Sequence, residues 1–433
     1  MEVMPGYKQT EIGVIPEDWA VIPMAELFTF QNGVNADKAA YGKGIPFINV
    51  LEIITHSTLT EERIPGRISL PPQTNSAFRV QTGDVLFNRT SETQEEVGLA
   101  SVYIDNREVV FGGFVIRARP RNGSLDPMFS SYALRSPLIR QQIISRGQGA
   151  VRANIGQQDL SKVQLFVPSL PEQEAIAAVL SNADAIIESY EQLIAKKHLL
   201  KKGVMRELLT GKRRLRGFAS ATTSYKQTEV GVIPEDWDCV RIGELIDLLT
   251  GFPFPSRSYS KSGVRLLRGS NVKRGVTDWS EEGTEYWPAI SSEIKKYVLK
   301  SGDIVVAMDG SLVGRSFAML SESDVPALLL QRVARIRSSV VDQKFLKAWI
   351  CSQRFTEHCD TVKTVTAIPH ISPSDIRSFT IALPPVKAEQ EAIGAILFDM
   401  DAEVALLEAQ LAKYRQLKQG LMQKLLTGRI RLI

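Results

Sequence analysis

Two stretches of the chain repeat apolar residues at alternating steps of three and four. The seam positions are Ile176, Leu180, Ile187, Ile194 and Leu208 in the first stretch, and Ile393, Leu397, Val404, Leu411 and Leu425 in the second. This heptad pattern is typical of helices that pack along a shared seam. Each stretch is predicted to form one helix of roughly 40 residues, about 60 Å long. Neither helix can bury its seam alone, so we expect the two to pack on each other.

The ends of the two stretches carry signals of their own. Ser169 and Glu172 form an S-x-x-E capping box just ahead of the first stretch. Both stretches end in the letters LLTG, which places Gly211 and Gly428 as left-handed caps. The pattern therefore predicts where each helix begins and ends.

Lys201 and Lys418 occupy equivalent positions of the two seams and interrupt the apolar pattern. A charge in a seam weakens packing but can fix the register of the helices. Alternatively, both side chains extend along the helix surface until the ammonium group reaches water. The sequence leaves these two interpretations open.

The segments ahead of each helix, about 20–167 and 238–382, follow a different pattern. They contain short apolar runs broken by Gly, Pro, Asn and Asp, such as DVLFNRT, GGFVIRAR, VRLLRGSNV and DIVVAMDGS. Such runs predict strands, and we expect a mixed α/β domain with a mainly antiparallel sheet in each segment. Helical stretches are predicted near Met128 to Ser145 and near Gln343 to Cys359.

The chain is an internal duplication. YKQTEIGVIPEDW, from Tyr7 to Trp19, returns as YKQTEVGVIPEDW from Tyr225 to Trp237, and PEQEAIAAVL at 171–180 returns as AEQEAIGAIL at 388–397. Two copies of one unit related by a pseudo-twofold axis would place the long helices antiparallel. The predicted fold class is α+β, with two tandem pseudo-symmetric α/β domains separated by a pair of long antiparallel coiled-coil helices.

The expected order is a first sheet domain, a long helix, a linker, a second sheet domain, and a second long helix with a tail. The corresponding bounds are 1–168, 169–216, 217–224, 225–383 and 384–433. The linker, GFASATTS, is small and polar, which is typical of a flexible hinge.

The composition is that of a globular protein and not of a membrane or secreted protein. The 433 residues are 44% apolar and 23% charged, and no apolar run approaches the length of a membrane span. The N-terminus lacks the features of a signal peptide, and three cysteines without framework spacing fit a reducing compartment. A cytoplasmic location is expected, without a membrane partner. The net charge of +4 does not by itself demand a nucleic acid.

A strong catalytic signature is missing from the sequence. It contains no P-loop, G-x-G-x-x-G, G-x-S-x-G or H-E-x-x-H motif, and no Asn-Pro-Pro-aromatic tetrapeptide of DNA methyltransferases. The triplets Glu293–Lys295 and Asp342–Lys344 have the spacing of a nuclease metal site but do not recur in the other half. We expect no catalytic residue.

Two further groups offer possible metal ligands. Cys351, His358 and Cys359 lack a second C-x-x-C arm, which favours ordinary core and surface roles. The repeated pairs Glu17–Asp18 and Glu235–Asp236 lie between Pro and Trp, which favours a turn that docks the Trp. No metal site is expected.

With these features, the chain resembles the specificity subunits of type I restriction-modification systems. Three features carry the resemblance: the YKQTExGVIPEDW openings, the TGD and SGD strand turns, and the EQEAI…LLTG helices. The resemblance implies a non-catalytic subunit whose two target-recognition domains each read one part of a split, asymmetric double-stranded DNA site. It also implies that the helices bind modification subunits, expected as two copies, and that motor-nuclease restriction subunits join the complex. S-adenosylmethionine, ATP and Mg would bind only to those partners.

Residues that read DNA should lie on loops and carry groups able to bind phosphates or base edges. In the first domain the candidates are Asn88, Arg89, Thr90, Ser91, Arg146, Gln148, Arg152 and Asn154. In the second they are Asp309, Ser311, Arg315, Lys363, Thr364, Thr366 and His370, with Arg257, Tyr259, Lys261, Arg268, Ser270 and Asn271 at a rim. The alternatives are a self-contained nuclease and a coiled-coil scaffold that does not bind DNA.

Overall fold

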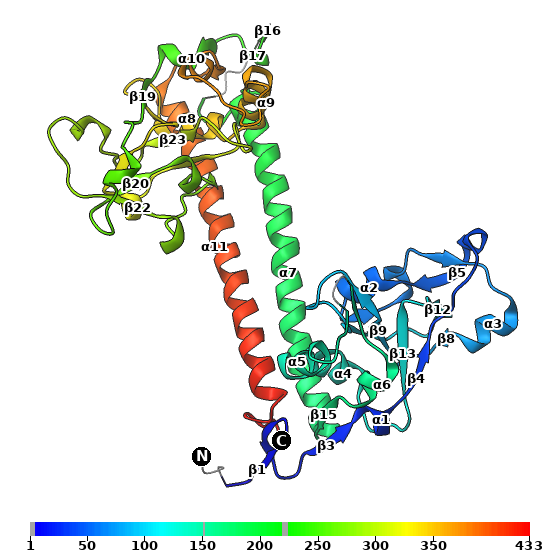
Figure 1. Ribbon diagram of the computed structural model, residues 1–433. Coiled ribbons are helices and arrows are strands. Elements are labelled where there is room, and N and C mark those ends of the chain that lie inside the picture. Colours follow the sequence, from blue (N-terminus) through cyan, green and yellow to red (C-terminus); the bar gives the residue numbers. More distant parts are fainter. Residues whose placement is uncertain (1–4, 150–151, 219–223) are drawn as a thin grey trace. The chain divides into compact units, whose positions relative to one another are not determined.

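The computed structural model describes residues 5–149, 152–218 and 224–433, and most of the predicted hinge, 219–223, lies outside them. The chain divides into two compact units (Figure 1), one formed by residues 1–191 with 409–433 and the other by residues 192–408. Each unit contains one sheet domain and part of each long helix.

The two predicted long helices are confirmed. Helix α7 is Leu170–Leu209, with 40 residues, and α11 is Lys387–Leu425, with 39. Each is followed by a glycine in the left-handed region, Gly211 with φ +65° and Gly428 with φ +68°. The glycine caps were therefore placed correctly by the LLTG pattern.

The helices run antiparallel within each unit. In the first unit the rings of Tyr190 and Tyr414 are 5.2 Å apart, and in the second Lys197 binds Glu403 at 2.5 Å. Most of the predicted seam positions are buried, but Ile187 is only half-buried. The outer seam residues Ile176 and Ile393 pack into the cores of the sheet domains, so each seam is covered by its own domain at one end.

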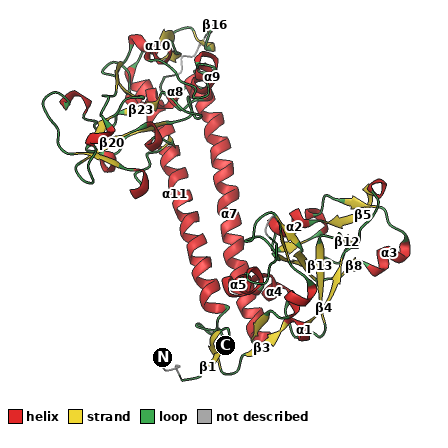
Figure 2. Ribbon diagram, viewed as in Figure 1, coloured by secondary structure: helices red, strands yellow, loops and turns green. Residues whose placement is uncertain are grey.

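The sheet domain of the first unit is built from a five-stranded and a four-stranded sheet (Figure 2). The five-stranded order is β4 (Phe28–Asn32), β13 (Val115–Pro120), β9 (Val85–Asn88), β11 (Ala100–Tyr103) and β6 (Thr58–Leu59). The four-stranded order is β7 (Arg67–Ile68), β5 (Tyr41–Ile48), β12 (Val109–Phe111) and β8 (Arg79–Val80). Neighbouring strands are antiparallel except at β6–β11 and β5–β12, as a mainly antiparallel sheet predicts.

The second unit repeats this arrangement. Its five-stranded order is β19 (Asp247–Thr250), β26 (Val333–Arg337), β23 (Ile304–Ala307), β24 (Phe317–Met319) and β21 (Arg274–Gly275). A three-stranded sheet follows the order β22 (Glu285–Trp287), β20 (Val264–Leu267) and β25 (Ala327–Leu329).

Shorter elements complete both units. Those of the first are β1 (Tyr7–Thr10), β2 (Gly13–Pro16), β3 (Ala20–Pro23), α1 (Met24–Leu27), α2 (Val50–Thr55), α3 (Pro72–Ala77), β10 (Thr90–Ser91), β14 (Ala153–Asn154), α6 (Gln157–Ser161) and β15 (Gln164–Val167). Those of the second are β16 (Tyr225–Thr228), β17 (Gly231–Pro234), β18 (Asp238–Arg241), α10 (Pro373–Arg377) and β27 (Thr380–Leu383). Each repeated YKQT segment thus forms the first strand of a hairpin.

Each predicted helix of the sheet domains is in fact two helices. The first stretch forms α4 (Pro127–Ala133) and α5 (Pro137–Ile144), and the second forms α8 (Gln343–Ile350) and α9 (Gln353–Val362). Pro137 cannot continue a helix because it lacks an N–H group. In the second copy Ser352 caps a new helix by accepting a hydrogen bond from the backbone N–H of Phe355.

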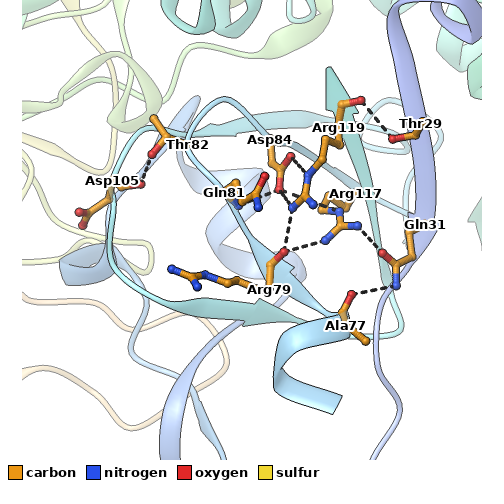
Figure 3. Close-up of polar contacts among 10 residues, drawn as sticks. All are labelled: Thr29, Gln31, Ala77, Arg79, Gln81, Thr82, Asp84, Asp105, Arg117 and Arg119. Carbon is orange, nitrogen blue, oxygen red and sulfur yellow. Dashed lines mark hydrogen bonds and ion pairs between the residues drawn. The ribbon is translucent and has the colours of Figure 1, made fainter. Parts of the chain in front are cut away.

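The TGD and SGD turns hold arginines of neighbouring strands, and Figure 3 shows the contacts of the TGD turn. The Asp84 carboxylate accepts hydrogen bonds from the Arg119 guanidinium at 2.7 and 2.8 Å and from the backbone of Gln81 at 2.7 Å. Arg117 donates to the carbonyl of Arg79 at 2.7 Å. In the second unit Asp303 accepts a hydrogen bond from Arg337 in the same way, at 2.7 Å. The motif therefore joins a turn to the strand beside it.

Candidate nucleic-acid interface

The two predicted clusters of the first unit lie side by side. Strand β10 pairs with β14, so that Thr90 is opposite Asn154. The backbone N–H of Ile155 donates to the carbonyl of Arg89 at 3.0 Å, and Gln148 and Asn154 exchange backbone hydrogen bonds of 2.8 and 2.7 Å. Sequence positions about 60 residues apart thus form one surface, which we call the first junction, residues 88–91 with 146–149 and 152–154.

Four predicted residues of the first junction are exposed. These are Arg89, Gln148, Arg152 and Asn154. Thr90 and Arg146 are half-buried, and Arg146 donates to the carbonyl of Gln142 at 2.8 Å. The exposed groups include two guanidinium and two amide groups, which can bind phosphates and base edges.

Asn88 and Ser91 do not belong to the exposed surface. Asn88 is fully buried and donates from its side-chain amide to the carbonyl of Glu96 at 2.9 Å. The Ser91 hydroxyl is also buried and donates to the Glu96 carboxylate at 3.1 Å. The prediction that these two side chains face DNA is corrected, because both are used to fold the loop after β9.

A buried arginine supports this loop from behind. The Arg140 guanidinium donates to the carbonyls of Glu95, Val97 and Gly98 at 2.7 to 2.8 Å. Its burial lowers the pKa of Arg140 to about 10. Because the residues that it holds precede β11 and contact Asn88, Arg140 positions the first junction without reaching its surface.

The second unit builds an equivalent surface, the second junction, from residues 309–315 and 363–370. Asp309 forms an antiparallel bridge with His370, and the backbone N–H of Gly310 donates to the carbonyl of Pro369 at 3.0 Å. Thr364 and His370 are hydrogen-bonded through their side chains at 2.9 Å. Of the predicted residues, Ser311, Thr366 and His370 are exposed, and Asp309, Lys363 and Thr364 are half-buried.

The two cations predicted for the second junction share one carboxylate. Arg315 donates to Asp360 at 3.0 and 2.6 Å, and Lys363 donates to the same carboxylate at 2.6 Å. The hydrogen bonds from Arg315 and then Lys363 lower the pKa of Asp360 to about 2. The Arg315 pair joins the 309–315 loop to α9, and the Lys363 pair lies at the end of α9 itself. Both cations are therefore engaged, which leaves this junction less basic than its sequence predicts.

The predicted rim divides into two places. An added Cβ at Gly269 would be 3.4 Å from the Asp309 carboxylate, so the segment borders the second junction at Gly269, next to the exposed Ser270. The Arg268 guanidinium is engaged elsewhere, because it donates to the carbonyl of Gly283. Asn271 is buried and donates to the carbonyls of Asp278 and Gly283 at 2.9 and 3.0 Å, which corrects its assignment to DNA contact.

The remaining rim residues lie by the smaller sheet. Arg257 and Lys261 are exposed, whereas Tyr259 is half-buried and packs in the cluster around Phe254 and Leu266. Ser260 bridges to Tyr286 on β22. This segment therefore belongs to the β22–β20–β25 sheet.

Sequence reasoning missed a third segment of each junction, the turn ahead of β13 or β26. The backbone N–H of Arg89 donates to the carbonyl of Phe114 at 2.8 Å, and Met308 donates to the carbonyl of Arg332 at 2.8 Å. Both Phe114 and Arg332 are exposed. The available signal was the alignment of GGFVIRAR (112–119) with LQRVARIR (330–337). The two arginines of the strand match, but the residue just before the strand is Phe114 in one copy and Arg332 in the other.

The sequence comparisons agree with this doubled architecture. The model of the type I restriction modification DNA specificity domain matches residues 16–196 and again 234–414. This chain belongs to that specificity-subunit family. It is 27% identical over 429 residues to the type I restriction enzyme MjaVIII specificity subunit of Methanocaldococcus jannaschii, covering 96% of this chain and 94% of the relative. It is 23% identical to the EcoKI specificity subunit of Escherichia coli K12, covering 96% and 90%.

Solved structures show the same fold. The specificity subunit of a type I system from M. genitalium matches with a TM-score of 0.60 and 14% identity over 98% of both chains. A chain from a study of complex assembly and conformational transition of the type I system matches with a TM-score of 0.52 and 16% identity, over 96% of this chain and 99% of that chain. Two tandem α/β domains with long helices are therefore the fold of this family member.

In each unit, the repeated opening block of this specificity-subunit chain takes part in a polar cluster that we call a clasp. Each clasp contains a Trp and an Asp of the block, a Glu near the start of one long helix and an Arg after the end of the other. In the first, the indole N–H of Trp19 donates to Glu172 at 2.9 Å, and Arg431 donates to Glu172 at 2.6 and 2.9 Å and to Asp18 at 2.7 and 2.9 Å. The Glu172 carboxylate, predicted to cap α7, thus accepts its hydrogen bonds from Trp19 and Arg431. The hairpin, the start of α7 and the tail after α11 meet at one buried carboxylate.

The second clasp uses the equivalent positions. Arg214 donates to Glu389 at 2.6 and 2.7 Å and to Asp236 at 3.0 and 3.1 Å, and lies 5.5 Å from the ring of Trp237. Trp237 is fully buried. The interpretation of the acidic pairs as parts of a turn that docks a Trp is confirmed for both copies.

The other candidate ligands have ordinary environments. Asp342 accepts a hydrogen bond from the backbone N–H of Phe345 at 2.8 Å and so caps α8. Burial raises the pKa of the Cys351 and Cys359 thiols to about 12. Within the described parts of the chain, no group of three or more His, Cys, Asp and Glu side chains is arranged to hold a metal ion. Nor does any helix in those parts have the length and apolar character needed to cross a membrane.

Proposed function

We propose that this chain is a non-catalytic subunit that recognises a split, asymmetric site in double-stranded DNA, with one half read by each unit. The observation that carries the proposal is the doubled junction. The same backbone arrangement, a loop after the central strand joined to a loop after the second short helix, occurs twice with different exposed side chains.

The side chains of the two junctions fit different DNA sequences. The first presents Arg89, Arg152 and Asn154, and the second presents Ser311, Thr366 and His370. Arg and Asn pair preferentially with guanine and adenine edges, whereas hydroxyl groups are less selective. Because the two sets differ, the two half-sites are expected to differ, and a palindromic target would contradict the proposal.

The long helices offer equivalent docking surfaces for a partner. Leu200 on α7 and Leu417 on α11 occupy equivalent positions and are 52% and 55% exposed. Each unit also has a groove beside the end of one helix, lined by Met205 and Leu209 in the second unit and by their equivalents in the first. A surface present twice is expected to bind two copies of one chain.

We propose that these copies are adenine-modifying subunits, because relatives are named as specificity subunits of type I restriction enzymes. Motor-nuclease subunits would join through that complex. S-adenosylmethionine, ATP and Mg would then bind to the partners, and the complex would work in the cytoplasm.

A genome-wide map of adenine methylation tests the recognition role. Cells that express this chain with its modification subunit are compared with cells that lack only this chain. The expected result is the loss of one split, asymmetric methylated motif. No difference, with the modification subunit active alongside another specificity chain, would contradict the proposal and favour a scaffold. DNA cutting by the purified chain with magnesium alone would favour the nuclease.

The first junction can be tested by the salt dependence of DNA binding. Each lost phosphate contact reduces the slope of log K against log salt by about 0.9, so Arg89→Ala with Arg152→Ala should reduce it by about 1.8. The slope is measured on the complex with modification subunits. Arg107→Ala, an exposed arginine of the same unit outside the junction, serves as the control. An unchanged slope in the double variant would place the DNA elsewhere.

A further inference from the structure

The turn ahead of the arginine strand occupies the same place in both junctions but carries very different side chains. In each unit its carbonyl accepts the backbone N–H that follows β9 or β23, at 2.8 Å. The first unit has Phe114 at this position, 63% exposed, and the second has Arg332, whose side chain is 62% exposed. Phe114 is the most exposed aromatic residue of the described chain, well above Tyr225 at 46% and Tyr41 at 42%, and it borders the first junction.

Arg332 has an unusual backbone conformation. Its φ is +72°, which no other non-glycine residue in the described parts of the chain shares in the left-handed region. A non-glycine side chain in this region is strained, and a glycine would relieve the strain. Strain of this kind tends to persist where the side chain itself is needed.

The fold makes little use of the Arg332 guanidinium. Arg315 and Arg337 bind carboxylates with hydrogen bonds of 2.6 to 3.0 Å. Arg332, in contrast, reaches Asp309 only at 3.9 Å, which is longer than a hydrogen bond. Asp309 is paired with His370 in the second junction, so the acidic side chain orients Arg332 toward that surface without engaging its donors.

We infer that this turn carries a specificity-determining side chain in each unit, with Arg332 reading a guanine and Phe114 contacting a thymine methyl group. The inference rests on the proposed DNA-reading function and adds residues to it. An arginine with free donors can bind the O6 and N7 acceptors of guanine together in the major groove. Phenylalanine has no hydrogen-bonding group, so its contribution is apolar contact, for which the thymine methyl is the matching feature.

Arg332→Gly removes the guanidinium group without destabilising the fold, so a loss of DNA recognition can be told apart from a loss of stability. Glycine adopts a φ of +72° readily, so the thermal midpoint of the variant should equal or exceed that of the wild type. The variant complex, with its modification subunits, methylates a pool of duplexes in which every position of the motif found by the methylation map is randomised in turn. Discrimination for guanine at one position of the second half-site should fall by about 10-fold or more, and the first half-site should be unchanged.

Phe114→Ala is the reciprocal variant and control. It should relax one thymine position of the first half-site and leave the second half-site unchanged. If Arg332→Gly keeps the wild-type preference at every position while the wild type methylates a split motif, the inference about this turn is wrong and the proposed function stands. If the wild-type complex selects no split motif in this assay, the proposed function itself fails.

Discussion

Two buried carboxylates, Glu172 and Glu389, explain at the residue scale why the chain carries the same opening block twice. Both are almost completely removed from solvent, and each binds an arginine from the segment that follows the other long helix. A carboxylate buried in this way is costly unless it is paired. The clasps therefore require an acid, an arginine and a docked Trp in both copies, which leaves little freedom for the block to diverge.

Arg214→Ala tests the second clasp and gives a pH-dependent loss of stability. Burial raises the pKa of Glu389 above its ordinary 4.5, so the folded state loses stability as pH rises through that pKa. Without Arg214 the pKa rises further. The variant should be destabilised by about 3 kcal/mol at pH 7 and by less at pH 5, because the raised pKa favours the neutral carboxyl group more at the lower pH. Urea unfolding at both pH values measures the difference.

The control for this measurement is Arg216→Ala, an exposed arginine two residues along the same segment. It should change the free energy of unfolding little at either pH. Equal destabilisation of Arg214→Ala at pH 5 and pH 7 would mean that the arginine acts by packing on Trp237 and not by neutralising Glu389.

At the scale of elements, the seam lysines form reciprocal ion pairs between the long helices. Lys201 of α7 binds Asp401 of α11, and Lys418 of α11 binds Asp184 of α7. The two pairs are equivalent positions with the helices exchanged. This observation favours the interpretation that the lysines fix the register, because both ammonium groups end on a carboxylate of the opposite helix. Such pairs match only one register of the two helices.

A double-mutant cycle on Asp184→Asn and Lys418→Met measures the strength of this interaction. The two side chains are 39% and 23% exposed, so a coupling free energy of about 0.5 to 1 kcal/mol is expected, decreasing with salt. The more exposed pair Glu191 and Arg415, on the same helices, is the matched comparison and should couple less strongly. Zero coupling in the first cycle would show that Lys418 merely extends to water.

At the scale of the whole molecule, each unit is assembled from distant parts of the sequence. The first unit contains both chain ends, and the Tyr7 hydroxyl donates to the carbonyl of Gly428 at 2.9 Å. The second unit contains the middle of the chain, with the end of α7 and the start of α11. Both units therefore present the same set of parts, which is the basis for expecting two equivalent partners.

Substitution of the exposed leucines tests that stoichiometry. Leu200→Asp and Leu417→Asp should each remove one modification subunit from the co-expressed complex, and the double variant should remove both, because a charge in an apolar contact is costly. Native mass spectrometry counts the subunits. Val340→Asp changes an apolar residue outside the helices that is 61% exposed, and it should leave the count unchanged. A double variant that still binds two copies would exclude this face.

The sequence by itself determined the long helices, their C-terminal glycine caps, the duplication and the Trp-docking turns. These features depend on local spacing: a seam repeats every seven residues, a cap needs a glycine at one position, and a copied block is visible directly. It also indicated which loops carry the candidate readers, because polar residues after short apolar runs are a local pattern.

Only the tertiary structure decided which of those residues reach a surface. Asn88 and Asn271 are buried and donate to loop carbonyls, and Arg315 is bound by Asp360. Arg332 is exposed on a turn that the sequence did not single out. These outcomes depend on partners far along the chain. No local pattern encodes whether a donor will meet a carbonyl, a carboxylate or solvent, because that depends on how strands and loops from distant segments come together.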